Sequence, residues 1–205
     1  KTIVEDNGVQ AKLIVDGDIN TIVKLRMIAQ NQQLLRADFD QTPTSEVLAR
    51  CLHDYSASLA AADVVILSDY GKGGLTHVAD MIKQARESNI PVIVDPKGDD
   101  YSRYAGASLI TPNMKEFEAV VGKVIDEDDF LAKALKLKSD LNLGSLLVTR
   151  SEKGMSLITA DNQKVDSPAI ALEVFDVSGA GDTVIAFMAL AHAIGLTPQI
   201  SLALA

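Results

Sequence analysis

The sequence has 205 residues, of which 47% are hydrophobic and only 4% aromatic. This suits one globular domain with an aliphatic core, as in α/β proteins whose parallel strands are buried. The net charge of −9 and the lack of a long apolar stretch argue against nucleic acid and membrane as partners. A single cysteine, Cys51, cannot form an internal disulfide, which favours a reducing cytoplasm.

The N-terminal part of the chain predicts extended structure. Short β-type runs cover residues 10–15, 22–28 and 33–39, separated by turn-forming Gly, Asn and Asp residues. This segment, at about 10–39, is interpreted as a small β lid over a substrate, a dimer contact or a plain edge sheet. Residues 44–59 then predict a helix, because apolar side chains recur on one face.

Strands and helices alternate from about residue 60 to the end. The pattern predicts strands at 64–67, 92–94, 109–110 and 146–148, a hairpin at 155–166, helices at 75–88, 113–121, 128–141 and 179–194, and another helix from Pro198. Such alternation is typical of a mainly parallel sheet with helices on both faces. The chain starts without Met and stops in an apolar run, so we expect residues 1–205 to be a partial domain, truncated at both ends.

Four polar loops follow the predicted parallel strands. They cover residues 68–73, 95–98, 111–113 and 149–151, and all are rich in Gly or Pro or carry charges. Because ligands of open α/β sheets collect beyond the carboxyl ends of the strands, these loops indicate a functional edge.

Residues 176–183, DVSGAGDT, precede the long C-terminal helix. Gly179, Ala180 and Gly181 allow the backbone to approach a ligand, and a helix N-terminus attracts anions. Asp182 lies in the first turn, where a carboxylate either partners the helix dipole or acts as a general base. These residues alone leave the two roles evenly balanced.

Two further segments are also candidates for a ligand site. Asn113, Met114, Lys115 and Glu116 combine Asn and Glu at capping-box spacing, which starts a helix and equally suits a phosphate and metal site. Thr149, Arg150, Ser151 and Gly154 follow a strand and read, by themselves, as a plain turn.

The DVSGAGDT segment resembles the C-terminal signature of the ribokinase-like (PfkB) carbohydrate kinases, with Ser178 at the family's usual Thr. The resemblance implies that Asp182 is the catalytic base and that residues 179–181 form the anion hole. It implies an ATP and Mg²⁺ site at Asn113–Glu116 and Thr149–Gly154, with Glu116 holding the metal through water.

The match extends over nearly the whole chain to the kinase domain of the bacterial heptose 7-phosphate kinase/heptose 1-phosphate adenylyltransferase family. It includes the stretches NQQLLR at 31–36, LSDYGKG at 67–73 and DPKG at 95–98. It implies phosphorylation of the anomeric hydroxyl of D-glycero-β-D-manno-heptose 7-phosphate, in the formation of ADP-heptose for lipopolysaccharide. A homodimer in the cytoplasm is expected.

An anionic sugar phosphate requires cations beside the acceptor site. Arg36, Lys72, Lys97 and Arg103 are candidates, and each is equally consistent with a solvated surface charge. Asp69 is interpreted as a ligand of sugar hydroxyls or as a cap of its own loop. Two alternatives remain: a related kinase for another sugar phosphate or a nucleoside, and an inactive nucleotide-binding fragment that lacks part of the sugar site.

Overall fold

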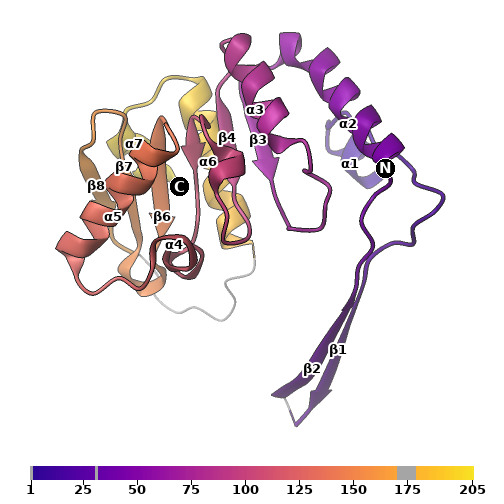
Figure 1. Ribbon diagram of the computed structural model, residues 1–205, viewed down its shortest axis with the longest axis horizontal. Coiled ribbons are helices and arrows are strands. Elements are labelled where there is room, and N and C mark those ends of the chain that lie inside the picture. Colours follow the sequence, from indigo (N-terminus) through magenta and orange to yellow (C-terminus); the bar gives the residue numbers. More distant parts are fainter. Residues whose placement is uncertain (1, 31, 170–178) are drawn as a thin grey trace.

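The computed structural model describes residues 2–30, 32–169 and 179–205. Its centre is a six-stranded sheet in the order β3 (Val65–Ser68), β4 (Val92–Asp95), β5 (Leu109–Ile110), β6 (Ser145–Thr149), β7 (Met155–Ile158) and β8 (Lys164–Ser167) (Figure 1). Strands β3 to β6 run parallel, and β6, β7 and β8 pair antiparallel. The predicted mainly parallel sheet is therefore confirmed.

Alternation along the strands divides the core into two layers. Val92 and Val94 of β4 face one buried cluster, whereas Ile93 between them faces the other. Leu147 of β6 likewise points away from its neighbours Leu146 and Val148. Strands that are apolar on both faces need helices on both sides.

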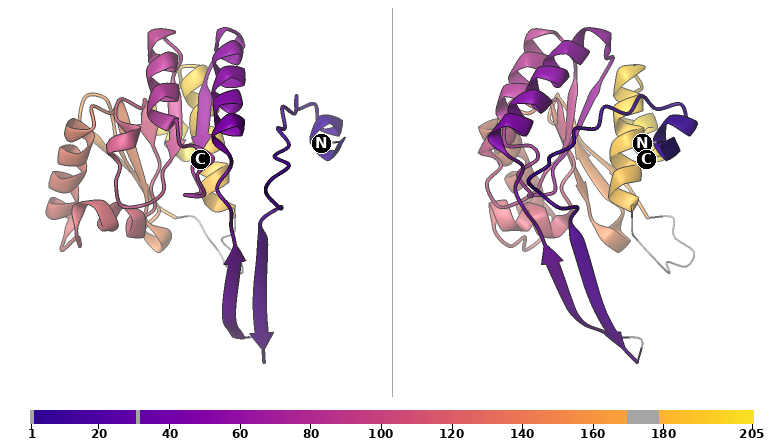
Figure 2. Two further views of the ribbon diagram at one scale, coloured as in Figure 1. Left: turned by 45° about the vertical axis from the view of Figure 1, so that its right-hand side comes forward. Right: turned by 90° about the vertical axis from the view of Figure 1, so that its right-hand side faces the viewer.

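The two sets of helices cover opposite faces of the sheet (Figure 2). Helices α2 (Ser45–Ser58), α3 (Val78–Glu87), α4 (Met114–Val121) and α5 (Glu127–Asp140) lie over one face, where Ile82, Phe117 and Phe130 are fully buried. Helices α6 (Ala180–Ala193) and α7 (Pro198–Leu204) lie over the other face. Short 3₁₀ turns occur at η1 (Leu59–Ala61), η2 (Ser102–Tyr104) and η3 (Ser151–Lys153).

The N-terminal segment stands apart from this body. It holds a short helix α1 (Thr2–Asp6) and the antiparallel hairpin β1 (Val23–Ala29) and β2 (Gln32–Phe39), which projects away from the helices and sheet (Figures 1 and 2). The small N-terminal β element is thus confirmed, while its boundaries as a separate unit and its role stay predictions.

One predicted strand is wrong. Residues 10–15 form no strand but cross α2, where Lys12 Nζ donates a hydrogen bond to Ser58 Oγ at 2.7 Å. Asp16, next along the chain, accepts a hydrogen bond from Thr44 N at 3.1 Å. In the described part of the chain no strand pairs with this run, so its β-type residues have no ladder to join.

The remaining elements agree with the predicted ones within a few residues. The largest difference is at α3, which begins at Val78 rather than Leu75 because residues 71–77 form turns. Among the described residues, no helix has the length and apolar character needed to cross a membrane.

Candidate active site

The carboxyl ends of four strands bring the predicted polar loops to one edge. Asp69 N donates a hydrogen bond to Asp95 O at 3.0 Å, which ties the loop after β3 to the end of β4. Asn113, just after β5, forms a parallel bridge with Thr149 at the end of β6. Segments far apart in the sequence therefore form a continuous rim.

Carboxylates from three elements converge on this rim. The pKa of Asp95 is raised to about 6, first by burial and then by the nearby negative charges of Glu116 and Asp182. Asp69 adds a smaller contribution in the same direction, and Lys97 opposes it. Asp95 of β4 thus lies close enough to Glu116 of α4 and Asp182 of α6 to feel the charges of both.

The first turn of α6 contains Asp182, whose charge acts on Asp95. Gly179 precedes the helix with φ 81°, in the left-handed region that favours glycine. Val184 and Ile185 bury the first turns of α6 against the sheet, while Asp182 stays exposed. The N–H groups of Ala180 and Gly181 belong to the first turn, which has no acceptors within its own helix. The other signature residues, Asp176 to Ser178, lie outside the described residues.

Asn113 and Glu116 form the capping box that their spacing predicts. Asn113 Oδ1 accepts from Glu116 N at 3.0 Å, and Glu116 Oε2 accepts from Asn113 N at 3.0 Å. Glu116 Oε1 accepts a third hydrogen bond from Lys97 Nζ at 2.6 Å. That bond is the main cause of the raised pKa of Lys97. Met114 packs against the core and Lys115 is exposed.

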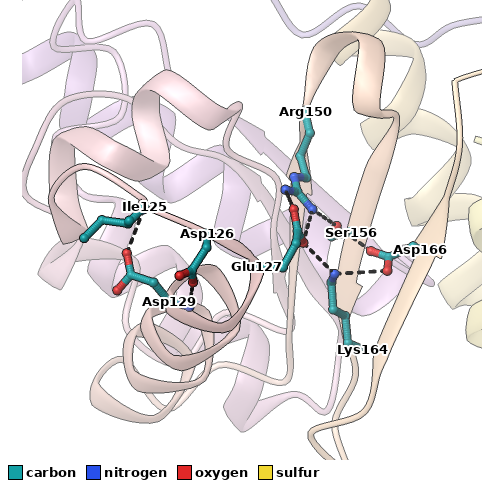
Figure 3. A network of polar contacts seen from close by, with 8 residues as sticks. All are labelled: Ile125, Asp126, Glu127, Asp129, Arg150, Ser156, Lys164 and Asp166. Atoms are coloured by element: carbon teal, nitrogen blue, oxygen red, sulfur yellow. Dashed lines mark hydrogen bonds and ion pairs between the residues drawn. The ribbon is translucent and has the colours of Figure 1, made fainter.

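The predicted nucleotide turn after β6 is tightly closed. Arg150 N donates to Gly154 O at 2.7 Å, and Ser151 takes a positive φ of 54°. The side chain of Arg150 points toward Glu127, which accepts its hydrogen bonds (Figure 3). Any direct contact of this turn with a nucleotide therefore falls to Thr149, Ser151, Gly154 and the backbone.

Asp69 makes the loop contact that capping requires. Its Oδ1 accepts from Gly71 N at 2.7 Å and its Oδ2 from the Tyr104 hydroxyl at 2.7 Å. The carboxylate is buried, and Arg103 Nη1 lies 3.6 Å from Oδ2. Asp69 therefore organises the loop after β3 in this structure.

The four candidate cations lie in different places. Lys97 reaches the carboxylate rim, and Arg103 lies beside Asp69 with its other contact at Leu75 O. Lys72 pairs with Asp40. Arg36 pairs with Asp38 at 3.1 Å on the projecting hairpin. The structure brings Lys97 and Arg103 to the strand ends and places Arg36 away from them.

The donor set at the rim fits a hydrated divalent cation. No group of three or more potential ligands with metal-site geometry occurs among the described residues. Mg²⁺ commonly takes one or two carboxylates and keeps several waters. Asp95 and Glu116 could supply those carboxylates. The raised pKa of Asp95 reflects burial first and then neighbouring negative charge, which a cation would neutralise. Asp95 belongs to the loop at 95–98 that was expected at the functional edge, but it was not itself among the predicted site residues.

Comparisons with known proteins identify the family of the chain. A model described as "pfkB family carbohydrate kinase" matches residues 1–205. The chain is 52% identical over 192 residues to the bifunctional protein HldE of Shewanella amazonensis, covering 94% of the chain and 40% of that protein. It is 50% identical over 188 residues to the HldE protein of Aeromonas salmonicida, with 92% and 40% covered. The chain thus spans about 40% of the length of these curated relatives.

Solved structures share the fold at low sequence identity. Phosphofructokinase-2 from Escherichia coli, in complex with potassium, gives a TM-score of 0.76 at 16% identity, covering 98% of this chain and 67% of that one. Arabidopsis thaliana ribokinase, complexed with ribose and ATP, gives 0.65 at 19% identity, covering 82% and 57%.

Fold and family together define the class as the carbohydrate kinases. The chain belongs to the pfkB family of carbohydrate kinases. The ribokinase-like α/β architecture expected from the sequence is confirmed.

Proposed function

We propose that this chain is the kinase part of an enzyme that phosphorylates the anomeric C1 hydroxyl of D-glycero-β-D-manno-heptose 7-phosphate. The product would be the 1,7-bisphosphate, on the way to ADP-heptose. The observation that carries the phosphotransferase role is the convergence of Asp95, Glu116 and Asp182 at the glycine-rich start of α6.

In the proposed mechanism Asp182 accepts the proton of the sugar hydroxyl. The freed oxygen forms a bond to the γ-phosphorus of ATP, and the bond between that phosphorus and the bridging oxygen breaks, so ADP leaves with the electron pair. The first-turn N–H groups at Gly179–Gly181 stabilise charge on the transferred group. Mg²⁺, when bound, would neutralise phosphate charge, with Asp95 and Glu116 as its protein ligands.

Lys97 has a defined place in this proposal. In the described structure its ammonium is paired with Glu116, one of the two proposed metal ligands. We expect Lys97 to turn toward phosphate oxygens once the cation takes its place at Glu116. Lys72 and Arg103 are the further candidates for the sugar phosphate.

The heptose assignment is supported by the chain-wide resemblance and by identities near 50% to proteins named HldE. It can be tested with the purified intact protein by comparing turnover on heptose 7-phosphate, unphosphorylated heptose, fructose 6-phosphate and ribose. We expect kcat/KM to be highest for heptose 7-phosphate, by roughly a hundredfold over the unphosphorylated sugar, because unpaired binding-site cations penalise its binding. A clear preference for an unphosphorylated sugar would contradict the assignment while leaving the kinase class intact.

We also propose a homodimer formed through the β1–β2 hairpin, and a cytoplasmic location. Val23, Leu25, Met27, Leu35 and Phe39 share one face of the hairpin and are all exposed. An isolated two-stranded hairpin is marginally stable, so a second apolar surface would stabilise it. The free thiol of Cys51 is consistent with a reducing compartment.

A further inference from the structure

An ion-pair network lies behind the turn that follows β6 (Figure 3). Arg150 Nη1 donates to Glu127 Oε2 at 3.0 Å, and Arg150 Nη2 donates to Glu127 Oε1. Lys164 Nζ of β8 reaches Glu127 Oε2 at 3.0 Å and Asp166 Oδ2 at 3.0 Å. The network joins the first residue of α5 to strands β6 and β8.

Arg150 differs from an ordinary surface cation. Its residue surface is only 8% exposed, and its guanidinium lies 4.4 Å from the centre of the Phe130 ring. Nη1 also donates to Ser156 Oγ at 3.0 Å, and Ser156 Oγ in turn donates to Asp166 Oδ1 at 2.6 Å. Removing Glu127 would leave the buried guanidinium of Arg150 without its main charged partner, which is costly.

The backbone on the other side of Arg150 lies at the candidate nucleotide site. Thr149 bridges to Asn113, and Arg150 N closes the turn onto Gly154 O. Gly154 has φ +79°, and a Cβ there would lie 2.0 Å from Ser167 O, so the turn is pressed against the end of β8. The network therefore holds the turn through the side chain of Arg150, while the residue before it, Thr149, borders Asn113.

We infer that Arg150 and Glu127 are positioning residues for ATP. Arg150 does not offer its guanidinium to the nucleotide but locks the turn at residues 150–154 against the start of α5. This sets the distance between that turn and Asn113–Glu116. The inference rests on the proposed function, because it assigns a role within the same nucleotide site.

The test measures the dissociation constant of ATP by calorimetry, and the KM values of both substrates, in the intact protein. Glu127→Gln is the main variant, because its side chain is 55% exposed and its amide keeps the shape of the carboxylate. Arg150→Met and the double variant complete a cycle. Asp129→Asn is the matched control: Asp129 lies on the same helix and pairs with Lys133 at 2.8 Å, away from β6.

We expect Glu127→Gln to raise the ATP dissociation constant roughly fivefold and Arg150→Met roughly tenfold or more, within the range measured for coupled residues. The double variant should bind ATP no more weakly than Arg150→Met, because both changes break the same ion pair. Asp129→Asn should match the wild-type protein, and the KM for the sugar should be unchanged throughout.

If Glu127→Gln bound ATP with wild-type affinity, the inference would be overturned. This holds whether Arg150→Met binds ATP more weakly, binds it equally well or fails to fold. Weakening in Arg150→Met alone would show that Arg150 contacts the nucleotide directly. If the wild-type protein bound no ATP, the proposed function itself would fail, and that result is distinguishable from the others.

Discussion

Asp95 illustrates, at the scale of single residues, how a site can lower the stability of a fold. Its carboxylate is partly buried beside Glu116 and Asp182, and no hydrogen bond from a side chain compensates it in the contacts found among the described residues. A carboxyl whose pKa rises on folding disfavours the folded state once it ionises. We interpret this cost as the price of a prepared cation site.

Replacing this carboxylate by an amide should therefore stabilise the metal-free protein. The pKa of Asp95 is about 6 in the folded state against an ordinary 3.8, so the folded state binds more protons between these values and loses stability as the pH rises through them. We expect Asp95→Asn to raise the free energy of unfolding at pH 7 by about 1–3 kcal/mol. The gain should shrink toward zero near pH 4.

Thermal melting from pH 4 to pH 8, without divalent metal, measures this effect. Asp99→Asn is the control, since Asp99 is an exposed carboxylate four residues further along the same segment. A stability gain that did not vary with pH, or a loss at pH 7, would contradict the proposed electrostatic origin.

The sequence could predict site residues where local spacing determines their contacts. Asn113 and Glu116 are three residues apart, so their capping box follows from helix geometry alone. Glu127 and Arg150 are 23 residues apart, and their pairing depends on how α5 packs over β6. No local pattern contains that information, so the sequence could not distinguish an inward-facing Arg150 from a nucleotide ligand.

At the scale of elements, the β1–β2 hairpin also separates what local sequence patterns predict from what depends on contacts with other elements. Alternating apolar residues predicted both strands, because period two fits any strand that presents two different faces. The β-type residues at 10–15 gave a wrong prediction, since a strand also needs a neighbouring strand with which to pair. Between the hairpin strands, Leu25 lies opposite Ala37 and Met27 opposite Leu35, all on the apolar face.

A charge on that face should separate the proposed dimer. Leu25 and Met27 are 50% and 53% exposed, so Leu25→Lys removes apolar contact area without disturbing the core of the domain. We expect the wild-type protein to be dimeric at micromolar concentration and Leu25→Lys to shift it toward monomer by tenfold or more in the dissociation constant. Light scattering coupled to size-exclusion chromatography provides the measurement.

Arg26→Glu serves as the matched change on the opposite, polar face of β1, where Arg26 lies across from Arg36. It should leave the dimer intact. A wild-type protein that stayed monomeric, or equal dissociation by both variants, would count against an interface on the apolar face and favour the hairpin as a lid.

At the scale of the whole molecule, two helical layers and one sheet determine where chemistry can occur. The layer with α4 brings Asn113 and Glu116 to the strand ends from one face, and α6 brings Asp182 from the other. The alternation of strands and helices made this edge predictable before any contact was known. The folded structure was needed to identify which residues at this edge neutralise or position one another.

The central claim is that Asp182 is the base of a phosphoryl transfer. The most direct test combines, for Asp182→Asn in the intact protein, the turnover number with heptose 7-phosphate and the dissociation constant of ATP. We expect turnover to fall by about 10²–10⁴-fold, because the amide cannot accept the proton. ATP binding should be unchanged or tighter, since a carboxylate that repels phosphate is removed. Near-normal turnover in Asp182→Asn would contradict the account.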